Sequence, residues 1–264
     1  MMKTPRPGRK YFFFDVDGTL TDNRTHKIVP SAQRTLDALR QNGHFTAIAT
    51  GRAHYKAMSF AESVCIDNLV CAGGGCLVVD GKVKEDRYLN RDKTLDLLHK
   101  ADERGIGWLL ILNDSDEVYM RDLRFLEQAG LRKELTTYIL DPSLDPDRLE
   151  GIFKVYLPLT TDDEEHTPWI NELGHLRMTP KYIVFQHDEK KDGILRMMHA
   201  LEADPVDVVV FGDAENDLVM FDDRWFSIAM GNGVEALKQK ADYVTAANVD
   251  DGIEKACKRF GWIR

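Results

Sequence analysis

The stretch from Tyr11 to Leu20, with the sequence YFFFDVDGTL, constrains the fold more than any other part of the chain. Its four apolar residues without alternation are typical of a strand buried on both faces, as in a parallel sheet. Parallel sheets bind ligands in the crevice beyond the carboxyl ends of their strands, so such a strand would present Asp15 there. Asp17 can face the same point, because Gly18 allows the backbone a tight bend. The alternative is a plain turn, since Asp-Gly pairs are common turn formers.

The composition is that of an ordinary globular protein. The chain has 264 residues, 43% hydrophobic and 30% charged, enough for one large domain or two smaller ones. A net charge of −9 without a long basic run argues against nucleic acid and anionic membrane as partners, and no apolar stretch has the length of a membrane span.

The N-terminal residues and the cysteines indicate the cellular compartment of the protein. Residues 1–10 lack the apolar region of a signal peptide and are expected to form a short, frayed lead-in. The cysteines have no zinc-like spacing, so we expect buried, reduced thiols in a cytoplasmic protein; they are Cys65, Cys71, Cys76 and Cys257.

The apolar and turn pattern predicts a doubly wound α/β core, with a parallel sheet, interrupted by an α+β module. The core should occupy residues 1–83 and 188–264, and the inserted module residues 84–187. Expected core strands are 11–14, 45–49, 68–72, 206–211, 226–230 and 243–245, with a hairpin from residue 76. Expected core helices are 31–42, with Ser31 as N-cap, 54–63, 191–201, 215–221, one ending near Lys240, and 250–260.

The inserted module has a different pattern. A helix is expected at 91–104, followed by an antiparallel hairpin of strands 108–112 and 117–121. Further strands are expected at 152–157, 176–178 and 182–186, with a helix that opens at the acidic residues 162–165, where negative charge suits the helix dipole.

Polar residues that can carry out chemistry follow several of the expected core strands. If these strands are parallel neighbours, all of their ends face one crevice. The residues are Asp15 and Asp17, then Thr50 with Gly51, then Asp213 with Asn216 and Asp217, and Lys190 at the start of the helix before that last strand. Each has a plainer alternative: Thr50 as a helix N-cap, Asp213 to Asp217 as a capping cluster, and Lys190 as a solvated lysine. All of these residues stand at matching strand ends, which favours one shared site over several unrelated structural roles.

The chemistry that suits this set of residues is phosphoryl transfer. The carboxylates of Asp15, Asp213 and Asp217 are hard ligands suited to Mg²⁺. A phosphate would be repelled by bare carboxylates, so Mg²⁺ and Lys190 would supply the compensating positive charge.

Two carboxylates can divide the covalent and the proton-transfer work between them. Asp15 can attack phosphorus to form an aspartyl-phosphate. Asp17 can protonate the leaving oxygen and then take a proton from the hydrolytic water. The Thr50 hydroxyl and nearby backbone N–H groups can hold phosphate oxygens.

The order of motifs, D-V-D-G-T, A-T-G-R, a lysine and G-D-A-E-N-D, resembles the haloacid dehalogenase superfamily of phosphatases over the whole chain. The insertion between the second and third motifs is similar to its class IIB, Cof-like branch. The resemblance implies a nucleophile at Asp15 and a general acid/base at Asp17, whose backbone carbonyl is also a metal ligand. It implies phosphate binding at Thr50, a metal-binding acid at Asp213, and supporting roles for Asn216 and Asp217. The module then corresponds to a cap that closes over the site and selects the substrate.

At two places the match to the family pattern is ambiguous or differs from it. The register of the third motif selects Lys190, four residues before Ile194, but Lys191 is adjacent. The third strand of relatives usually ends in Asn-Gly, whereas Gly74-Gly75 stands here. Among the module's residues, Arg121, Lys154 and Trp169 can line the crevice or simply pack, and the sequence does not decide between these roles.

The expected function is that of a Mg²⁺-dependent phosphatase of a small phosphorylated metabolite, with phosphosugars first and nucleotide-type cofactor phosphates second by resemblance. The chain is expected to be a monomer or weak homodimer. One alternative is a phosphotransferase or mutase that uses the same aspartyl-phosphate. Another is a non-catalytic, phosphate-binding regulatory protein, which would predict a broken motif, and none is broken here.

Overall fold

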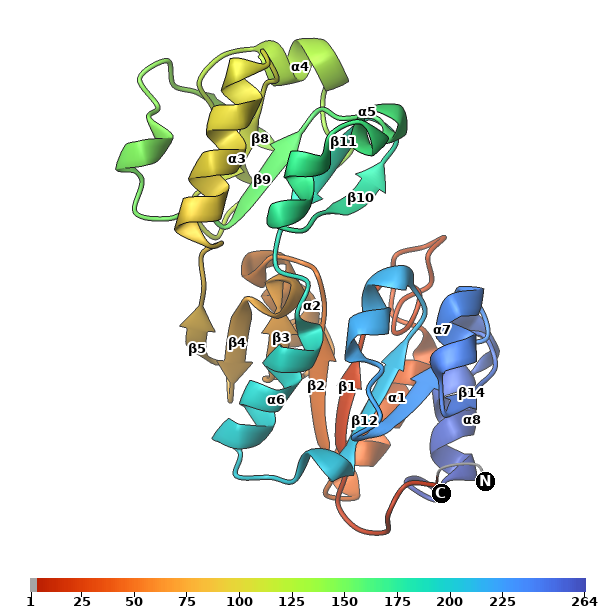
Figure 1. Cartoon of the computed structure of the whole chain (residues 1–264). Coiled ribbons are helices and arrows are strands. Elements are labelled where there is room, and N and C mark those ends of the chain that lie inside the picture. Colours follow the sequence, from red (N-terminus) through yellow and green to blue (C-terminus); the bar gives the residue numbers. More distant parts are fainter. Residues whose placement is uncertain (1–3) are drawn as a thin grey trace. The chain divides into compact units, whose positions relative to one another are not determined.

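The computed structural model describes residues 4–264, which divide into two compact units (Figure 1). The first unit comprises residues 4–86 and Glu189–Arg264, and the second comprises Arg87–Asp188. The insert was expected to begin at residue 84, but strand β5 (Lys82–Asp86) continues to Asp86 because it pairs with β4 (Cys76–Val79) in the sheet of the first unit.

The first unit alternates strands and helices. Its strands are β1 (Tyr11–Phe14), β2 (Phe45–Ala49), β3 (Leu69–Cys71), β4, β5, β12 (Val208–Gly212), β13 (Phe226–Ala229) and β14 (Tyr243–Val244). Its α-helices are α1 (Pro30–Gln41), α2 (His54–Ser63), α6 (Lys190–Ala200), α7 (Glu235–Lys240) and α8 (Gly252–Arg259). Its 3-10 helices are η1 (Ala72–Gly74), η4 (Pro205–Asp207), η5 (Glu215–Met220) and η6 (Asn248–Asp250).

These strands form one sheet in the order β14-β13-β12-β1-β2-β3-β4-β5, in which the neighbouring strands are parallel except for the antiparallel pairs β3–β4 and β4–β5. Apolar side chains cover both faces, as expected for a parallel sheet. Phe12 and Phe14 belong to the core cluster that includes residues of α1, α2 and α8, while Phe13 belongs to the cluster that includes residues of α6 and α7. The doubly wound α/β class is therefore confirmed, and the aromatic run is its central strand.

Two local predictions in this unit are wrong. Ser31 is not an N-cap, because Pro30 occupies the first position of α1 and Ser31 is buried in the first turn. The helix expected at 215–221 is present and has the tighter 3-10 form, η5. The lead-in does not remain frayed up to Lys10, since that side chain is buried and paired with Asp207. Residues 1–3 of the lead-in lie outside the described residues.

The second unit contains a sheet in the order β10-β11-β9-β6-β7-β8. The strands are β6 (Leu109–Ile111), β7 (Glu117–Met120), β8 (Thr137–Leu140), β9 (Lys154–Leu157), β10 (Leu176–Thr179) and β11 (Tyr182–Phe185). The helices are α3 (Arg91–Glu103), α4 (Arg124–Ala129) and α5 (Thr161–Glu165), with 3-10 helices η2 (Pro146–Arg148) and η3 (Pro168–Glu172).

The β6–β7 hairpin is antiparallel, as predicted, but α4 and β8 were not predicted. The strand β8 pairs in parallel with β7, an exception in a sheet whose other described pairs are antiparallel. The helices α3 and α4 contribute to different core clusters, on opposite faces of this sheet.

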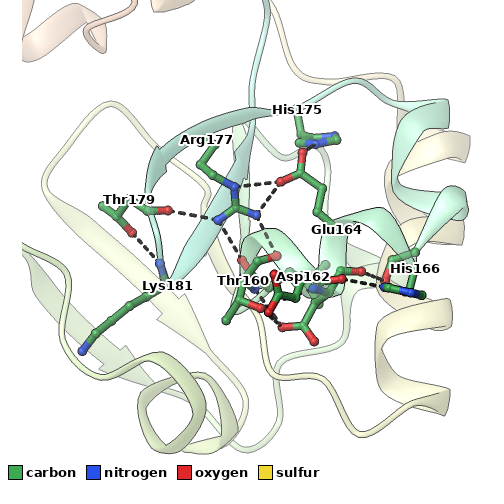
Figure 2. Close-up of polar contacts among 11 residues, drawn as sticks. Thr160, Asp162, Glu164, His166, His175, Arg177, Thr179 and Lys181 are labelled. Atoms are coloured by element: carbon green, nitrogen blue, oxygen red, sulfur yellow. Dashed lines mark hydrogen bonds and ion pairs between the residues drawn. The ribbon is translucent and has the colours of Figure 1, made fainter.

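A polar network joins the start of α5 to β10 (Figure 2). Arg177 donates through Nε and Nη2 to Glu164 Oε2, at 2.7 and 2.5 Å, and donates to the backbone carbonyls of Leu159, Thr160 and Thr179. His175 Nε2 contacts the other oxygen of Glu164. The hydrogen bond from His175 lowers the pKa of Glu164, as does Arg177, while burial opposes them.

Replacement of Glu164 by Gln is expected to destabilise the second unit by about 1–2 kcal/mol at neutral pH, because it removes a charge held by two partners. A carboxylate with a lowered pKa stabilises above its unfolded pKa, so this loss should shrink as the pH falls below the usual value of 4.5. Thermal melts at several pH values between about 3.5 and about 7 would measure this loss of stability. Glu165→Gln is the matched control, since Glu165 is adjacent and exposed. An equal loss of stability in both variants would contradict the stabilising role given to the contacts of Glu164.

No disulfide links the four cysteines, all of which lie within residues 4–264. Cys71, Cys76 and Cys257 are buried as expected, whereas Cys65 is exposed. Within residues 4–264, no helix is both long and apolar enough to cross a membrane.

Candidate active site

The site lies at one edge of the first unit's sheet, where three neighbouring parallel strands end. Asp15 directly follows β1, Thr50 directly follows β2, and Asp213 directly follows β12. Phe14 of β1 is in register with the last-but-one residues of both neighbours, Ile48 and Phe211. The three polar residues therefore meet beyond the carboxyl ends of the strands, where open α/β sheets bind ligands.

Three buried carboxylates gather at this edge. Asp15, Asp213 and Asp217 are only 5%, 7% and 0% exposed. One oxygen atom of each lies within 4.8 Å of the others. Asp217 reaches the group from η5, the short helix that follows β12. Carboxylates are rarely buried together unless a cation or a hydrogen-bond network compensates them.

Lys190 is the cation of this group. Its Nζ donates to Asp15 Oδ1 at 2.9 Å and to Asp217 Oδ1 at 2.6 Å, and its side chain is 1% exposed. Lys191 points elsewhere: it is 37% exposed, and its Nζ lies 3.6 Å from Asp222. The structure thus places Lys190 in the group and Lys191 outside it.

Glycines bring the start of α6, and with it Lys190, close to the strand ends. A Cβ atom on Gly74 would lie 2.4 Å from the backbone oxygen of Glu189, and one on Gly193 would lie 2.4 Å from a methyl group of Val70. Gly74 also has φ of +102°, a conformation that favours glycine. This close packing and the positive φ explain why position 74 requires glycine.

The electrostatics of the group reflect burial and crowding of like charges. Burial raises the pKa of Asp15, reinforced by the Asp217 carboxylate and opposed by Lys190. Burial, opposed by a hydrogen bond from Thr19, raises the pKa of Asp213 to about 6. Burial disfavours the charged form of Lys190, but the carboxylates of Asp15 and Asp217 outweigh it and raise the pKa of the lysine.

The charges do not balance within the group. When all three carboxylates are ionised, they carry three negative charges against the single positive charge of Lys190. This surplus, together with oxygen atoms that lie close to one another, fits a small divalent cation with oxygen ligands.

Backbone and side-chain contacts fix Asp213 and Asp217. Thr19 Oγ1 donates to Asp213 Oδ1 at 2.9 Å. Asp217 Oδ2 accepts from the backbone N–H groups of Asp213 and Ala214 at 2.9 and 3.1 Å, while its Oδ1 accepts from Lys190. Asp217 therefore combines the capping role considered for this segment with membership of the group. Asn216, half-buried on the same 3-10 helix, precedes it.

The side chain of Asp17 lies outside the group of three carboxylates. It is 51% exposed, and both of its oxygens accept from Arg52. Its charge is nonetheless close enough to contribute to the raised pKa of Asp213.

Thr50 is buried and is not an N-cap, because α2 begins four residues later with Ala53 at the cap position. Its Oγ1 accepts from the backbone N–H of Arg52 at 3.2 Å. Gly51 lies between these two residues, half-buried.

Three residues near the site were not assigned a role from sequence. They are Thr19, which holds Asp213, Arg52, which holds Asp17, and Asn232, which donates from Nδ2 to the carbonyl of Gly18 at 2.8 Å. Thr19 and Arg52 stand inside the motifs D-V-D-G-T and A-T-G-R, so position in those motifs was the available signal. Asn232 stands between Gly231 and Gly233, in the turn after β13.

Two of the three undecided residues of the second unit have packing partners there. Arg121 pairs with Asp102 and lies over the Trp108 ring, and Trp169 lies beneath Arg104. Lys154 is buried in β9.

Comparison with known proteins agrees with this geometry. Residues 12–257 match the model of a family described as haloacid dehalogenase-like hydrolase. A Bacillus subtilis protein named "Putative phosphatase YkrA" is 30% identical over 97% of this chain and 99% of its own length. The B. subtilis 5-amino-6-(5-phospho-D-ribitylamino)uracil phosphatase YitU is 24% identical over 93% of this chain and 95% of its own length.

Solved structures show the same architecture over both units. A hypothetical protein from Geobacillus kaustophilus HTA426 superposes with a TM-score of 0.81 at 28% identity, covering 97% of this chain and all of its own. The sugar phosphatase BT4131, described as a member of subclass IIB of the haloacid dehalogenase superfamily, superposes with a TM-score of 0.77 at 25% identity. It covers 96% of this chain and 100% of its own.

Proposed function

We propose that this chain, which belongs to the haloacid dehalogenase-like hydrolases and is a phosphoric monoester hydrolase, is a Mg²⁺-dependent phosphatase of small phosphorylated metabolites. The proposed reaction proceeds through an aspartyl-phosphate. The observation that carries the proposal is the convergence of Asp15, Asp213, Asp217 and Lys190 at adjacent strand ends.

In the first half-reaction, an oxygen of Asp15 forms a bond to phosphorus while the bond from phosphorus to the leaving oxygen breaks. Asp17 donates a proton to that leaving oxygen. In the second half-reaction, Asp17 takes a proton from water, whose oxygen bonds to phosphorus and releases Asp15. Burial of Asp15 beside Lys190 keeps its carboxylate poorly hydrated, in a fixed position for attack.

The residues that would hold a magnesium ion are Asp15, Asp213 and Asp217, together with the backbone carbonyl of Asp17. Asp15 and Asp213 each have an oxygen beyond the one held by Lys190 or Thr19, whereas both oxygens of Asp217 accept hydrogen bonds. When bound, the ion supplies charge that offsets the carboxylates and draws in the phosphate.

Phosphate oxygens are expected to be held by Thr50, Gly51 and Lys190. Thr50 and Gly51 stand at the end of β2, beside Asp15 at the end of β1. Lys190 would act on charge that every phosphomonoester has in common. Asn216 would support the position of Asp217 from the same 3-10 helix.

Substrate choice is proposed to reside in the second unit, acting as a cap. All residues assigned to the chemistry belong to the first unit, so discrimination among phosphomonoesters must come from groups that touch the non-reacting part. Sugar and polyol phosphates are the first class to consider, because BT4131 is named a sugar phosphatase and YitU a phosphatase of a ribityl phosphate. A phosphotransferase would differ in using a second hydroxyl in place of water.

A screen of phosphorylated metabolites tests this function directly. Phosphate release should require Mg²⁺, stop when the ion is removed with a chelator, and return on its replacement. Ca²⁺ should support less than about a tenth of the rate, because it takes more and longer oxygen contacts than Mg²⁺. Full activity in chelator would contradict the metal assignment, and phosphoryl transfer to an added alcohol in preference to water would favour the phosphotransferase.

A further inference from the structure

Arg52 and Asp17 form a two-pronged ion pair beside the group of three carboxylates. Arg52 Nε donates to Asp17 Oδ2 at 2.9 Å, and Nη2 donates to Oδ1 at 2.5 Å. Arg52 is 26% exposed and Asp17 is 51% exposed. A paired guanidinium fixes the plane of a carboxylate as well as its position, which a lysine cannot do.

Arg52 is itself held at several points. Its backbone N–H donates to Thr50 Oγ1 at 3.2 Å, and its carbonyl accepts from the N–H of Ala72 at 2.7 Å. Its guanidinium lies 5.5 Å from the centre of the Phe60 ring, on α2. Isolated surface ion pairs contribute little because two long side chains must be ordered. Here the arginine is ordered by the strand end and by α2, so the pair can orient the aspartate.

We propose that Arg52 is a positioning residue for Asp17, an assignment that rests on the proposed function. An aspartate so exposed would otherwise rotate freely about its side-chain bonds. Arg52 restrains it, keeping one oxygen while the other carries the proton that passes to the leaving oxygen. In that step the proton leaves Asp17 as the bond from phosphorus to the leaving oxygen breaks, and the bond from Asp15 to phosphorus forms.

This role predicts a dependence on the leaving group. Phenyl phosphate and p-nitrophenyl phosphate are nearly alike in shape, but nitrophenolate is the weaker base and leaves without a proton. Arg52→Ala should therefore lower kcat/KM for phenyl phosphate at least about tenfold more than for p-nitrophenyl phosphate, as a misplaced general acid would. Asp17→Asn should show the same pattern. Arg52→Lys, which keeps the charge and loses the fork, should fall between Arg52→Ala and the unmodified enzyme.

A double-mutant cycle separates this role from two others. If Arg52 acts through Asp17, the double variant Arg52→Ala, Asp17→Asn should be no slower than Asp17→Asn alone. If the losses in kcat/KM of the two single variants multiply in the double variant, Arg52 contacts the phosphate itself. If Arg52→Ala lowers kcat/KM equally for both substrates, its role is structural. Either result overturns the proposal. Arg40→Ala is the control, because Arg40 also pairs with an aspartate, Asp37, but on α1 away from the strand ends.

The cycle also distinguishes failure of this inference from failure of the proposed function. If Asp17→Asn depends on the leaving group and Arg52→Ala does not, only the positioning role is wrong. If neither depends on it, Asp17 is not the general acid, and the role of Arg52 is lost with it.

Discussion

Replacement of Asp15 by Asn is expected to abolish turnover, with a loss on the order of 10⁴-fold or more in kcat. The amide is nearly isosteric with the carboxylate but cannot act as this nucleophile. Asp15 is 5% exposed, between the ends of β2 and β12, so its replacement by a group of similar size should leave the sheet intact. Release of phosphate from p-nitrophenyl phosphate by the purified variant would measure the loss.

The control for Asp15→Asn is Asp22→Asn. Asp22 is a half-buried aspartate in the loop after β1, and its carboxylate accepts from Arg24 and Thr25 in its own turn. This variant should retain near-normal rates. Appreciable phosphate release by a folded Asp15→Asn protein, shown by mass spectrometry to be free of the unmodified chain, would contradict the assignment of the nucleophile.

Replacement of Lys190 by Ala is expected to lower kcat for every substrate by about 10²–10³-fold, and the neighbouring Lys191→Ala should change it less than about twofold. Lys190 is buried between Asp15 and Asp217, so its removal leaves two carboxylates without their shared cation. Lys191 is 37% exposed and faces Asp222, so it tests whether loss of any lysine from this helix is harmful. Steady-state rates on several phosphomonoesters would measure both effects.

Lys190→Ala removes a buried cation and is expected to reduce stability as well as activity. Lys190→Met, which keeps most of the volume, separates the two effects: it should remain as slow as the alanine variant while its Tm differs. Equal losses from Lys190 and Lys191, or a reordering of substrates by Lys190→Ala alone, would contradict a role on charge common to all substrates.

The core fold followed from the sequence because its strands carry an unambiguous pattern. Buried parallel strands read as continuous apolar runs, and Tyr11–Phe14 and Phe45–Ala49 do so. The chain between residues 122 and 151 has no such pattern. Its helix α4 has only 6 residues, too few to show a helical period, and β8 has only exposed and half-buried side chains, so no apolar pattern marks either element.

The site could be predicted as a set of strand-end residues, but not as a set of contacts. The register of the third motif favours Lys190 over the adjacent Lys191, and in the structure the direction of each side chain from α6 separates the two. The pairing of Arg52 with Asp17 likewise depends on a turn after β2 whose geometry no local pattern encodes. The glycine at position 74 departs from the family pattern in sequence, and only the structure shows that it permits a close contact between η1 and the start of α6.

The most direct test of the account is to trap the covalent intermediate. The enzyme would be mixed with phosphate-labelled substrate in Mg²⁺, quenched with acid within one turnover, and reduced with borohydride, which converts an aspartyl-phosphate to homoserine. An aspartyl-phosphate mechanism predicts protein-bound phosphate that appears before free phosphate, and homoserine at position 15 in the digested peptide, with neither in Asp15→Asn. Product formation without protein-bound phosphate, or a label on another residue, would contradict it.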